Sequence, residues 1–349
     1  MDSSLPHSAD SRLDALQQWL GTLPATLGLE PETLQPASGD ASFRHYFRIQ
    51  AGTATRIIMD APPPHEDCRP FIRIAQRLSQ AGLNVPVIFA QDIEQGFMVL
   101  SDLGTQTYYE AIQGGLNGAA LQERYRQVLQ ELVRMQQADT ADLPAYDQAR
   151  LLAELELFPV WYIQAHCGFE LKDSQRSMLD QTFQTLTADN ARQPHVFVHR
   201  DFHSPNLMIN AAGEHEPPGI IDFQDAMAGP ISYDIASLVM DARTTWDEDQ
   251  QLDWAIRYWD AAREAMLPVS ADFADFHRQY EWISLQRNLR ILGVFARLSH
   301  RDAKHHYLDH IPRVQAYVRQ VAGRYREFHA LLRLLDQVEQ REIRSGYSF

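Results

Sequence analysis

One short β-rich segment interrupts a chain whose patterning is helical over most of its length. The stretch VFVHRDFHSPNLMIN, residues 196–210, is an apolar run that stops at His199 and resumes after Asn206. Turn-forming residues follow, and then a second apolar run, GIIDF, which contains Asp222. Two such runs around a turn predict a β-hairpin, which brings the start of its first strand beside the end of its second. We therefore expect Asn206 to lie next to Asp222, with Asp201 on the preceding loop pointing at the same place.

Two carboxylates and an amide oxygen in one place are costly to bury without a compensating charge. Mg²⁺ suits them, because it binds one or two carboxylates together with waters and phosphate oxygens. The spacing His-x-Asp-x4-Asn, followed by an apolar Asp-Phe, is typical of kinase-type phosphoryl transfer. The pattern assigns Asp201 as the base that accepts the proton of the attacking hydroxyl, and Asn206 and Asp222 as Mg²⁺ ligands. For any one of these residues alone, a helix cap or a turn is the alternative interpretation.

Three neighbouring residues have supporting or open roles. His199 is expected to pack under the loop and to bond to backbone, whereas His203 is either a solvated loop residue or a substrate contact. The two histidines lie on a loop rather than on one helix face and have no evident third ligand, so a zinc site is disfavoured. Asp234 follows a Gly-Pro turn just inside an expected helix. There it either caps the helix or bonds to the backbone of the 199–201 loop, and both are structural support.

The composition, 45% hydrophobic and 22% charged over 349 residues, is that of an ordinary globular protein of two domains or two lobes. No apolar run is long enough to cross a bilayer, and the polar, acidic N-terminal stretch does not have the features of a secretory signal. The two cysteines, Cys68 and Cys167, make no disulfide framework, so we expect reduced thiols in the cytoplasm. A net charge of −15 argues against a nucleic-acid or anionic-membrane surface. No obligate protein partner is evident.

Residue periodicity predicts an N-terminal tail and helix (1–30), a small β-rich lobe (31–102) and a helical lobe (103–349), with a hinge near residues 100–105. In the first two parts we expect a helix over 11–29, strands from about residue 44 and near 56–59, a helix over 67–80, and two strands within 85–104. In the last part the β-rich segment 196–223 is flanked by expected helices over 107–113, 119–137, 147–166, 173–188, 233–241, 247–265, 272–298 and 312–343. The fold class is therefore α+β.

Several stretches resemble a known superfamily. VHRDFHSPNLM and IIDFQDAMAGPISYDIASL are similar to motifs of the aminoglycoside phosphotransferase and choline kinase-like superfamily. Its members share the two-lobed fold of protein kinases and phosphorylate small molecules. GDASFRHYFRI, GFMVLSDLG and QRNLRILGVFARLSHRDAKHHYLDHIP look like the bacterial N-acetylmuramate/N-acetylglucosamine anomeric kinases within it. The resemblance implies a protein-kinase-like fold, ATP and Mg²⁺ as cofactors, an amino-sugar substrate, and a sugar α-1-phosphate product in cell-wall recycling.

The resemblance also implies which residues contact the nucleotide. The loop over residues 38–43 would fold over the phosphates. Backbone near residues 98–101, at the end of the same β-rich lobe, would meet the adenine. The residues expected to bind ATP are Ser38, Gly39, Ser42, Arg44, Met98, Leu100 and Ser101.

One position departs from the kinase pattern. The lysine usual on the third strand is replaced by Met59, and the helix that follows has no evident glutamate. Strand alternation places Arg44 and Arg48 on one face. We expect Arg44, which is nearer the phosphate loop, to supply the missing cation, because arginine suits bidentate phosphate contact. There are two alternatives: Arg48 supplies this cation, or Arg44 is an exposed surface residue.

The sugar is expected to bind on the helical lobe, facing Asp201. Its hydroxyls need acidic or amide groups, its ring an aromatic face, and a lactyl carboxylate an arginine. The favoured substrate-binding residues are Asp225, Gln224, Glu156 and Arg290, while Glu154, Trp161, Arg243 and Arg287 remain open. Core packing or solvent exposure is the alternative for each.

Two other functions also remain open. Another small-molecule kinase of the superfamily, acting on an aminoglycoside, choline or a similar alcohol, would carry the same motifs. Met59 leaves open a nucleotide-binding pseudokinase that acts through partners.

Overall fold

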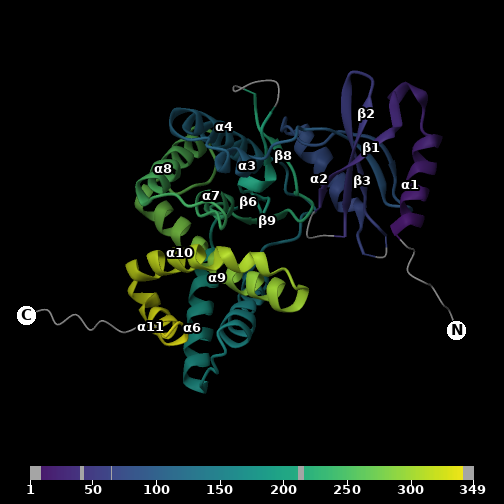
Figure 1. Ribbon diagram of the computed structural model, residues 1–349. Helices are drawn as coiled ribbons and strands as arrows, with labels where there is room; N and C mark the ends of the chain where they lie inside the picture. The colour runs from purple at the N-terminus through teal and green to yellow at the C-terminus, as the bar shows by residue number, and fades with distance from the viewer. Residues whose placement is uncertain (1–8, 40–42, 64, 211–215, 341–349) are drawn as a thin grey trace, which may run out of the picture. The chain divides into compact units, whose positions relative to one another are not determined.

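The computed structural model describes residues 9–39, 43–63, 65–210 and 216–340 (Figure 1). The chain divides into two compact units, one of Met1–Gln106 with Met208–Asp225 and the other of Thr107–Leu207 with Ala226–Phe349. The sequence-based division assigned residues 208–225 to the helical lobe, whereas the structure groups them with the first unit.

The first unit is built on a five-stranded antiparallel sheet in the order β1-β2-β3-β5-β4. Its strands are β1 (Leu29–Gly39), β2 (His45–Ala51), β3 (Ala54–Asp60), β4 (Ile88–Asp92) and β5 (Phe97–Ser101). Its helices are α1 (Ala9–Thr22), η1 (Ala25–Leu27) and α2 (Cys68–Gln80). A separate two-stranded sheet pairs β7 (Leu207–Met208) with β8 (Gly219–Ile220), as expected of the hairpin.

Strand alternation gives the five-stranded sheet two different faces. Phe47 and Ile58 are in register, and Ile58 belongs to a core cluster completed by Leu16, Trp19 and Leu20 of α1. Figure 1 shows α1 beside this sheet. The residues next to these along each strand face the opposite side of the sheet. Tyr46, Met59 and Met98 are in register on that side. Met59 is fully buried there, so the position that we aligned with the kinase lysine is a core position in this chain.

The N-terminal prediction was wrong beyond Thr22. The helix expected over 11–29 ends there because Pro24 and the left-handed Gly28, with φ 62°, interrupt it. The following residues form β1, which was not predicted. β1 could not be recognised in the sequence, because it contains two prolines and little alternation of apolar residues. Both features are tolerated in an edge strand.

The second unit is mostly helical, with one small sheet. In that sheet β6 (His195–Val198) pairs antiparallel with β9 (Met227–Pro230), and η3 (Ser204–Asn206) follows β6 in the chain. The helices are α3 (Tyr108–Gln113), α4 (Gly118–Gln136), α5 (Gln148–Leu155), η2 (Phe158–His166), α6 (Asp173–Asn190), α7 (Tyr233–Val239), α8 (Glu248–Glu264), α9 (Phe273–Asp302), η4 (His305–His310), α10 (Ile311–Arg324), η5 (Arg326–Phe328) and α11 (His329–Val338).

Three details of this unit differ from expectation. β9 lies beyond residue 223, where the β-rich segment was expected to end. The helix expected over 147–166 divides into α5 and η2 ahead of Pro159. The helix expected over 312–343 is broken at Tyr325, whose φ of −115° and ψ of 120° are extended. Among the described residues, no helix is both long and apolar enough to span a membrane.

The long helix α9 packs against η2, α10, α7 and α6. Its contact with η2 depends on Gly293, because a Cβ added there would lie 2.4 Å from the carbonyl carbon of Leu157. No side chain fits at that distance, so the absence of one lets the two backbones approach.

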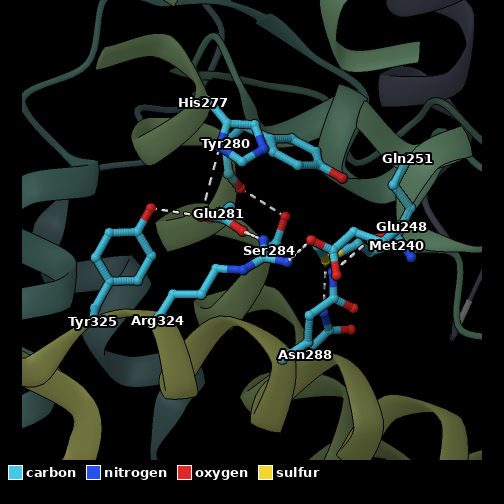
Figure 2. A network of polar contacts seen from close by, with 11 residues as sticks. Met240, Glu248, Gln251, His277, Tyr280, Glu281, Ser284, Asn288, Arg324 and Tyr325 are labelled. Atoms are coloured by element: carbon cyan, nitrogen blue, oxygen red, sulfur yellow. Dashed lines mark hydrogen bonds and ion pairs between the residues drawn. The ribbon is translucent and has the colours of Figure 1, made fainter. Parts of the chain in front are cut away.

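A polar network ties α9 to α8, to α10 and to Tyr325, the residue that follows α10 (Figure 2). Glu281 of α9 is 1% exposed, and it accepts hydrogen bonds from Arg324 and from Tyr325 Oη. Arg324 also pairs with Glu248 of α8. His277, one turn before Glu281, has its Nδ1 3.7 Å from Glu281 Oε2. Burial lowers the pKa of His277, and the attraction of Glu281 opposes that shift only in part.

Candidate active site

The loop after β6 carries the predicted proton acceptor, and Asp234 holds the backbone of this loop. Asp234 lies in the first turn of α7 and is fully buried. Its Oδ2 accepts the N–H of His199 at 2.7 Å, and its Oδ1 accepts the N–H of Arg200 at 3.0 Å. Burial raises the pKa of Asp234 to about 7, although the two backbone bonds oppose this rise. The structure thus places Asp234 in contact with the 199–201 loop.

Arg200 turns the chain into this loop with a φ of 78°, which is costly for a residue with a Cβ. Its side chain is held firmly: Nη2 lies 2.6 Å from Glu154 Oε1, and the guanidinium lies over the ring of Tyr146. Glu154 Oε2 also lies 3.0 Å from Arg290 Nε and accepts a hydrogen bond from Tyr146 Oη. The carboxylate of Glu154, whose role the sequence left open, therefore fixes two arginines near the 199–201 loop.

The carboxylate of Asp201 lies among cations. Burial by itself would raise its pKa, but the charges of Arg290, His203, Arg287 and Arg200 lower the pKa well below the usual range for aspartate. Asp201 is therefore ionised at neutral pH and can accept a hydrogen bond from a hydroxyl. So acidic a group is a weak base, which suits orienting a hydroxyl and taking its proton late in a loose phosphoryl-transfer transition state.

The two histidines of the loop are both buried. His199 is 1% exposed, and its Nδ1 accepts the N–H of Asp201 at 3.3 Å, in line with packing under the loop. His203 is 8% exposed, so it is not the solvated residue that was one of its two expected roles. Its Nδ1 lies 3.9 Å from Asp241 Oδ1.

Asp241 is a residue that the sequence reasoning missed. It is fully buried, and its Oδ2 accepts both the N–H of Ser204, at 3.2 Å, and the Ser204 hydroxyl. Its Oδ1 accepts the N–H of Arg243 at 2.8 Å. Burial opposes ionisation, but the nearby His203 and the bond from the Ser204 hydroxyl lower the pKa of Asp241 below its usual range. The available sequence clue was an aspartate directly after the apolar run of α7, where a charge needs a partner.

Asn206 closes the same loop. Its Nδ2 donates to the backbone oxygen of Asp201 at 2.9 Å, and its N–H donates to the backbone oxygen of His203. Because the amide nitrogen of the side chain is turned toward Asp201, the loop fixes the orientation of the Asn206 side-chain oxygen as well. The side chain that was expected to ligate a metal is therefore positioned by backbone.

In the first unit, Arg44 and Glu66 form a nearly buried ion pair. The Arg44 guanidinium lies 3.0 Å from Glu66 Oε2, and the residue is 8% exposed. Burial alone would lower the pKa of Arg44, but Tyr46, Glu66 and Asp222 raise it overall. Glu66 stands just before Asp67, the N-cap of α2, and the sequence analysis did not identify it as a partner of Arg44.

Arg48, the alternative phosphate-binding cation, is engaged elsewhere. Its guanidinium bonds to Asp102 Oδ2 at 2.6 Å and Oδ1 at 3.1 Å, and also to the Gly104 oxygen at 3.0 Å. Burial would raise the pKa of Asp102, but the bonds from Arg48 and Thr55 lower it. Arg48 therefore holds the chain just after β5, and Arg44 remains the better placed of the two.

The other expected nucleotide contacts have mixed placements. Met98 and Leu100 are buried in strand β5, which is paired with β3 on one side and β4 on the other. The N–H of Ser101 donates to the Val87 oxygen, and its hydroxyl accepts the Val87 N–H, so the sheet already uses these groups. Ser38 and Gly39 end β1, opposite Tyr46 and His45. Ser42 lies outside the described residues.

Asp222 sits on a strained turn of the first unit, with a φ of 65°. Its side chain is exposed, and its Oδ1 accepts the Nε2 of Gln224 at 2.8 Å. Phe223, between them, is buried and stacks on Phe71 of α2, which anchors the segment. Asp225 is exposed. Asp222 belongs to the first unit, and Asp201 and Asn206 belong to the second, so their meeting at one metal ion stays a prediction.

The two remaining predicted sugar contacts differ from one another. Arg290 is held near the 199–201 loop by Glu154, as described above. Glu156 is not: it pairs with Arg176 at 2.7 Å, in a contact where both side chains are more than one-third exposed.

The comparisons with known proteins agree with this architecture. The GDP complex of aminoglycoside 2'-phosphotransferase-IIIa is similar in fold, with a TM-score of 0.60 at 14% identity, over 89% of this chain and 99% of that one. The fold is thus the two-lobed, protein-kinase-like fold of small-molecule phosphotransferases. The model of the phosphotransferase enzyme family matches residues 33–272, and the chain belongs to this family.

Two curated relatives match over almost their whole length. The N-acetylmuramate/N-acetylglucosamine kinase of Pseudomonas aeruginosa is 42% identical over 342 residues, which cover 95% of this chain and 98% of that protein. The protein of the same name from Neisseria meningitidis is 39% identical over 337 residues, covering 96% and 98%.

Proposed function

We propose that this protein transfers the γ-phosphoryl group of ATP to the anomeric hydroxyl of N-acetylmuramate and of N-acetylglucosamine. The observation that carries the proposal is the identity of 42% to a kinase named for these two sugars, over nearly all of both chains. The product is the sugar α-1-phosphate, and the proposed setting is the recycling of cell-wall amino sugars.

In this proposal Asp201 accepts the proton of the anomeric hydroxyl. That hydroxyl belongs to a hemiacetal and is more acidic than an ordinary alcohol, so a weakly basic carboxylate is sufficient. Asp234, with its bonds of 2.7 and 3.0 Å to the loop backbone, fixes where the carboxylate stands. Positioning and electrostatics then supply most of the rate, as is general for phosphoryl transfer.

Arg44 is proposed to bind the ATP phosphates, with Glu66 holding its guanidinium in place. The Arg44–Glu66 pair, at 3.0 Å, would replace the lysine–glutamate pair of protein kinases. The planar guanidinium of arginine would then bind phosphate in place of the lysine ammonium. Backbone of the 38–43 loop is proposed to complete the phosphate site, and the segment that ends β5 is proposed to meet the adenine.

Asn206 and Asp222 would hold Mg²⁺. The donor chemistry fits, because an amide oxygen and a carboxylate are hard ligands. Two observations support the fit: the Asn206 amide nitrogen is tied to the Asp201 oxygen at 2.9 Å, and the Asp222 carboxylate is exposed rather than buried in a core. When bound, Mg²⁺ neutralises charge on the phosphate oxygens. Asp225, Gln224 and Arg290 are proposed to contact the sugar.

The test is a product identification. Purified protein with ATP and Mg²⁺ is offered N-acetylmuramate, N-acetylglucosamine, an aminoglycoside or choline, and ³¹P NMR identifies the phosphorylated position. We expect a signal from a sugar 1-phosphate with both amino sugars. Turnover only with the aminoglycoside or choline would assign the chain to another acceptor, and ATP binding without acceptor-dependent turnover would make it a pseudokinase.

A further inference from the structure

The side chain of Arg287 is a buried cation without a counter-charge in contact. It lies on α9 and is 3% exposed. Its Nε and Nη1 are enclosed and donate no hydrogen bond. Throughout the part of the chain that the structure describes, no carboxylate forms an ion pair with it. Its third nitrogen, Nη2, also donates no hydrogen bond and is not fully enclosed, so a ligand would have to approach the guanidinium from this end.

The neighbouring arginines, unlike Arg287, form ion pairs. Arg200 and Arg290 share Glu154, at 2.6 Å and 3.0 Å. A buried guanidinium stays charged at every accessible pH, so leaving one unpaired costs stability. A chain that supplies one carboxylate for two arginines and none for the third keeps that third cation available for an anion from outside.

Arg287 is close to the reaction centre of its unit. It precedes Arg290 by three residues, which puts the two side chains on one face of α9. Burial is the largest influence on the pKa of Asp201 and of Asp234, and Arg287 is among the charges that offset it at both. An anion bound by Arg287 would therefore lie in the neighbourhood of the group that accepts the proton.

We propose that Arg287 is a specificity-determining residue that binds the lactyl carboxylate of N-acetylmuramate. The inference rests on the proposed function. The two sugars in the names of the relatives differ by that one group, so a shared site must accept an anionic and a neutral substrate. The unpaired guanidinium meets both needs: its planar fork matches a carboxylate, and water can solvate it when the neutral sugar binds.

The decisive experiment compares both sugars in Arg287→Gln and Arg287→Lys. We expect kcat/KM for N-acetylmuramate to fall about 10- to 100-fold in Arg287→Gln, mostly through KM, because a charge-assisted bond is lost. The value for N-acetylglucosamine should stay within about threefold. Arg287→Lys should recover part of the loss, since it keeps the charge but not the fork.

Equal loss for both sugars would overturn the proposal, because Arg287 would then act on the transferred phosphoryl group or on Asp201. So would no loss for either. Two measurements distinguish a loss of carboxylate binding from damage to the fold. Arg287→Gln should not lower the melting temperature, because it leaves no ion-pair partner behind and removes an unpaired buried charge. Arg319→Gln, which removes an arginine paired with Asp336 and Glu339 in the same unit, should lower the melting temperature without changing the sugar preference.

Titration calorimetry without ATP tests the proposal independently, because it measures equilibrium binding of each sugar. Wild-type protein should bind N-acetylmuramate more tightly than N-acetylglucosamine, and Arg287→Gln should lose the difference. If the wild type phosphorylates neither sugar, the proposed function fails. If it phosphorylates both and Arg287→Gln reduces both equally, only the role of Arg287 fails.

Discussion

The guanidinium of Arg44 lies 3.0 Å from the carboxylate of Glu66, in a pair with 9% and 17% of the two side chains exposed. Protein kinases use a lysine of the third strand and a glutamate of the following helix for the corresponding contact. Here the cation comes from the residue before β2 and the acid from the residue before the N-cap of α2. In the role that we propose for it, this pair replaces the kinase pair, and the third-strand position is occupied by the buried Met59.

This pair predicts a defect in ATP binding. Arg44→Ala should raise the KM for ATP about 10-fold or more, because a charged hydrogen bond to phosphate is lost. Glu66→Gln should shift the KM in the same direction but less, since the guanidinium remains. Steady-state kinetics over a range of ATP concentrations measures both. Arg56→Ala, in the same sheet with its guanidinium over Phe89, is the control and should leave the KM unchanged. An unaltered KM in Arg44→Ala would return the role to Arg48 or to backbone amides.

Loss of the proton acceptor should affect turnover rather than nucleotide binding. Asp201→Asn keeps the shape of the side chain but removes its charge, so kcat should fall about 10²- to 10⁴-fold. The KM for ATP should stay within about threefold, because Asp201 is not proposed to touch the nucleotide. Asp180→Asn, on the surface of α6, is the control for an aspartate-to-asparagine change. Turnover near that of the wild type would remove Asp201 from the role.

The close approach of α9 and η2 predicts a stability effect. Gly293→Ala forces a methyl group against the Leu157 backbone, where the Cβ would have only 2.4 Å. The free energy of unfolding should fall by about 1–3 kcal/mol, as for overpacked cores. Gly323→Ala is a matched control in α10, where a Cβ meets nothing within 4 Å. It should stabilise the protein by about 0.5–1 kcal/mol, because alanine is the better helix former. Urea denaturation of both variants checks the difference in sign, and equal effects would contradict it.

The network in Figure 2 predicts a pH dependence of stability. Because burial lowers the pKa of His277, the unfolded chain binds this proton more readily than the folded one. The free energy of unfolding should therefore decrease as the pH falls through about 6.5, and be regained above that value. His277→Gln should show a smaller decrease from about pH 7.5 to about pH 5.5. His306→Gln, at an exposed position, should behave as the wild type. If His277→Gln follows the same curve as the wild type, another group is responsible.

The local patterns led to the right fold class. The helix expected over 67–80 is α2, and the strands expected within 85–104 are β4 and β5. The hairpin after Asn206 is β7 with β8. These succeeded because their periodicity and turn residues act over a few neighbours. β1 and β9 were missed because each is held by pairing with a strand elsewhere in the chain, and neither has an alternating pattern of its own.

The spacing of Asp201, Asn206 and Asp222 along the chain was enough to suggest phosphoryl transfer, because that spacing is typical of kinase-type enzymes. Partners that lie far apart in sequence needed the folded chain. Glu66 with Arg44, Glu154 with Arg200 and Arg290, and Asp241 with Ser204 are each joined by packing that no local pattern encodes. The same holds for Arg287, since whether a buried charge has a partner depends on every side chain that folding brings around it.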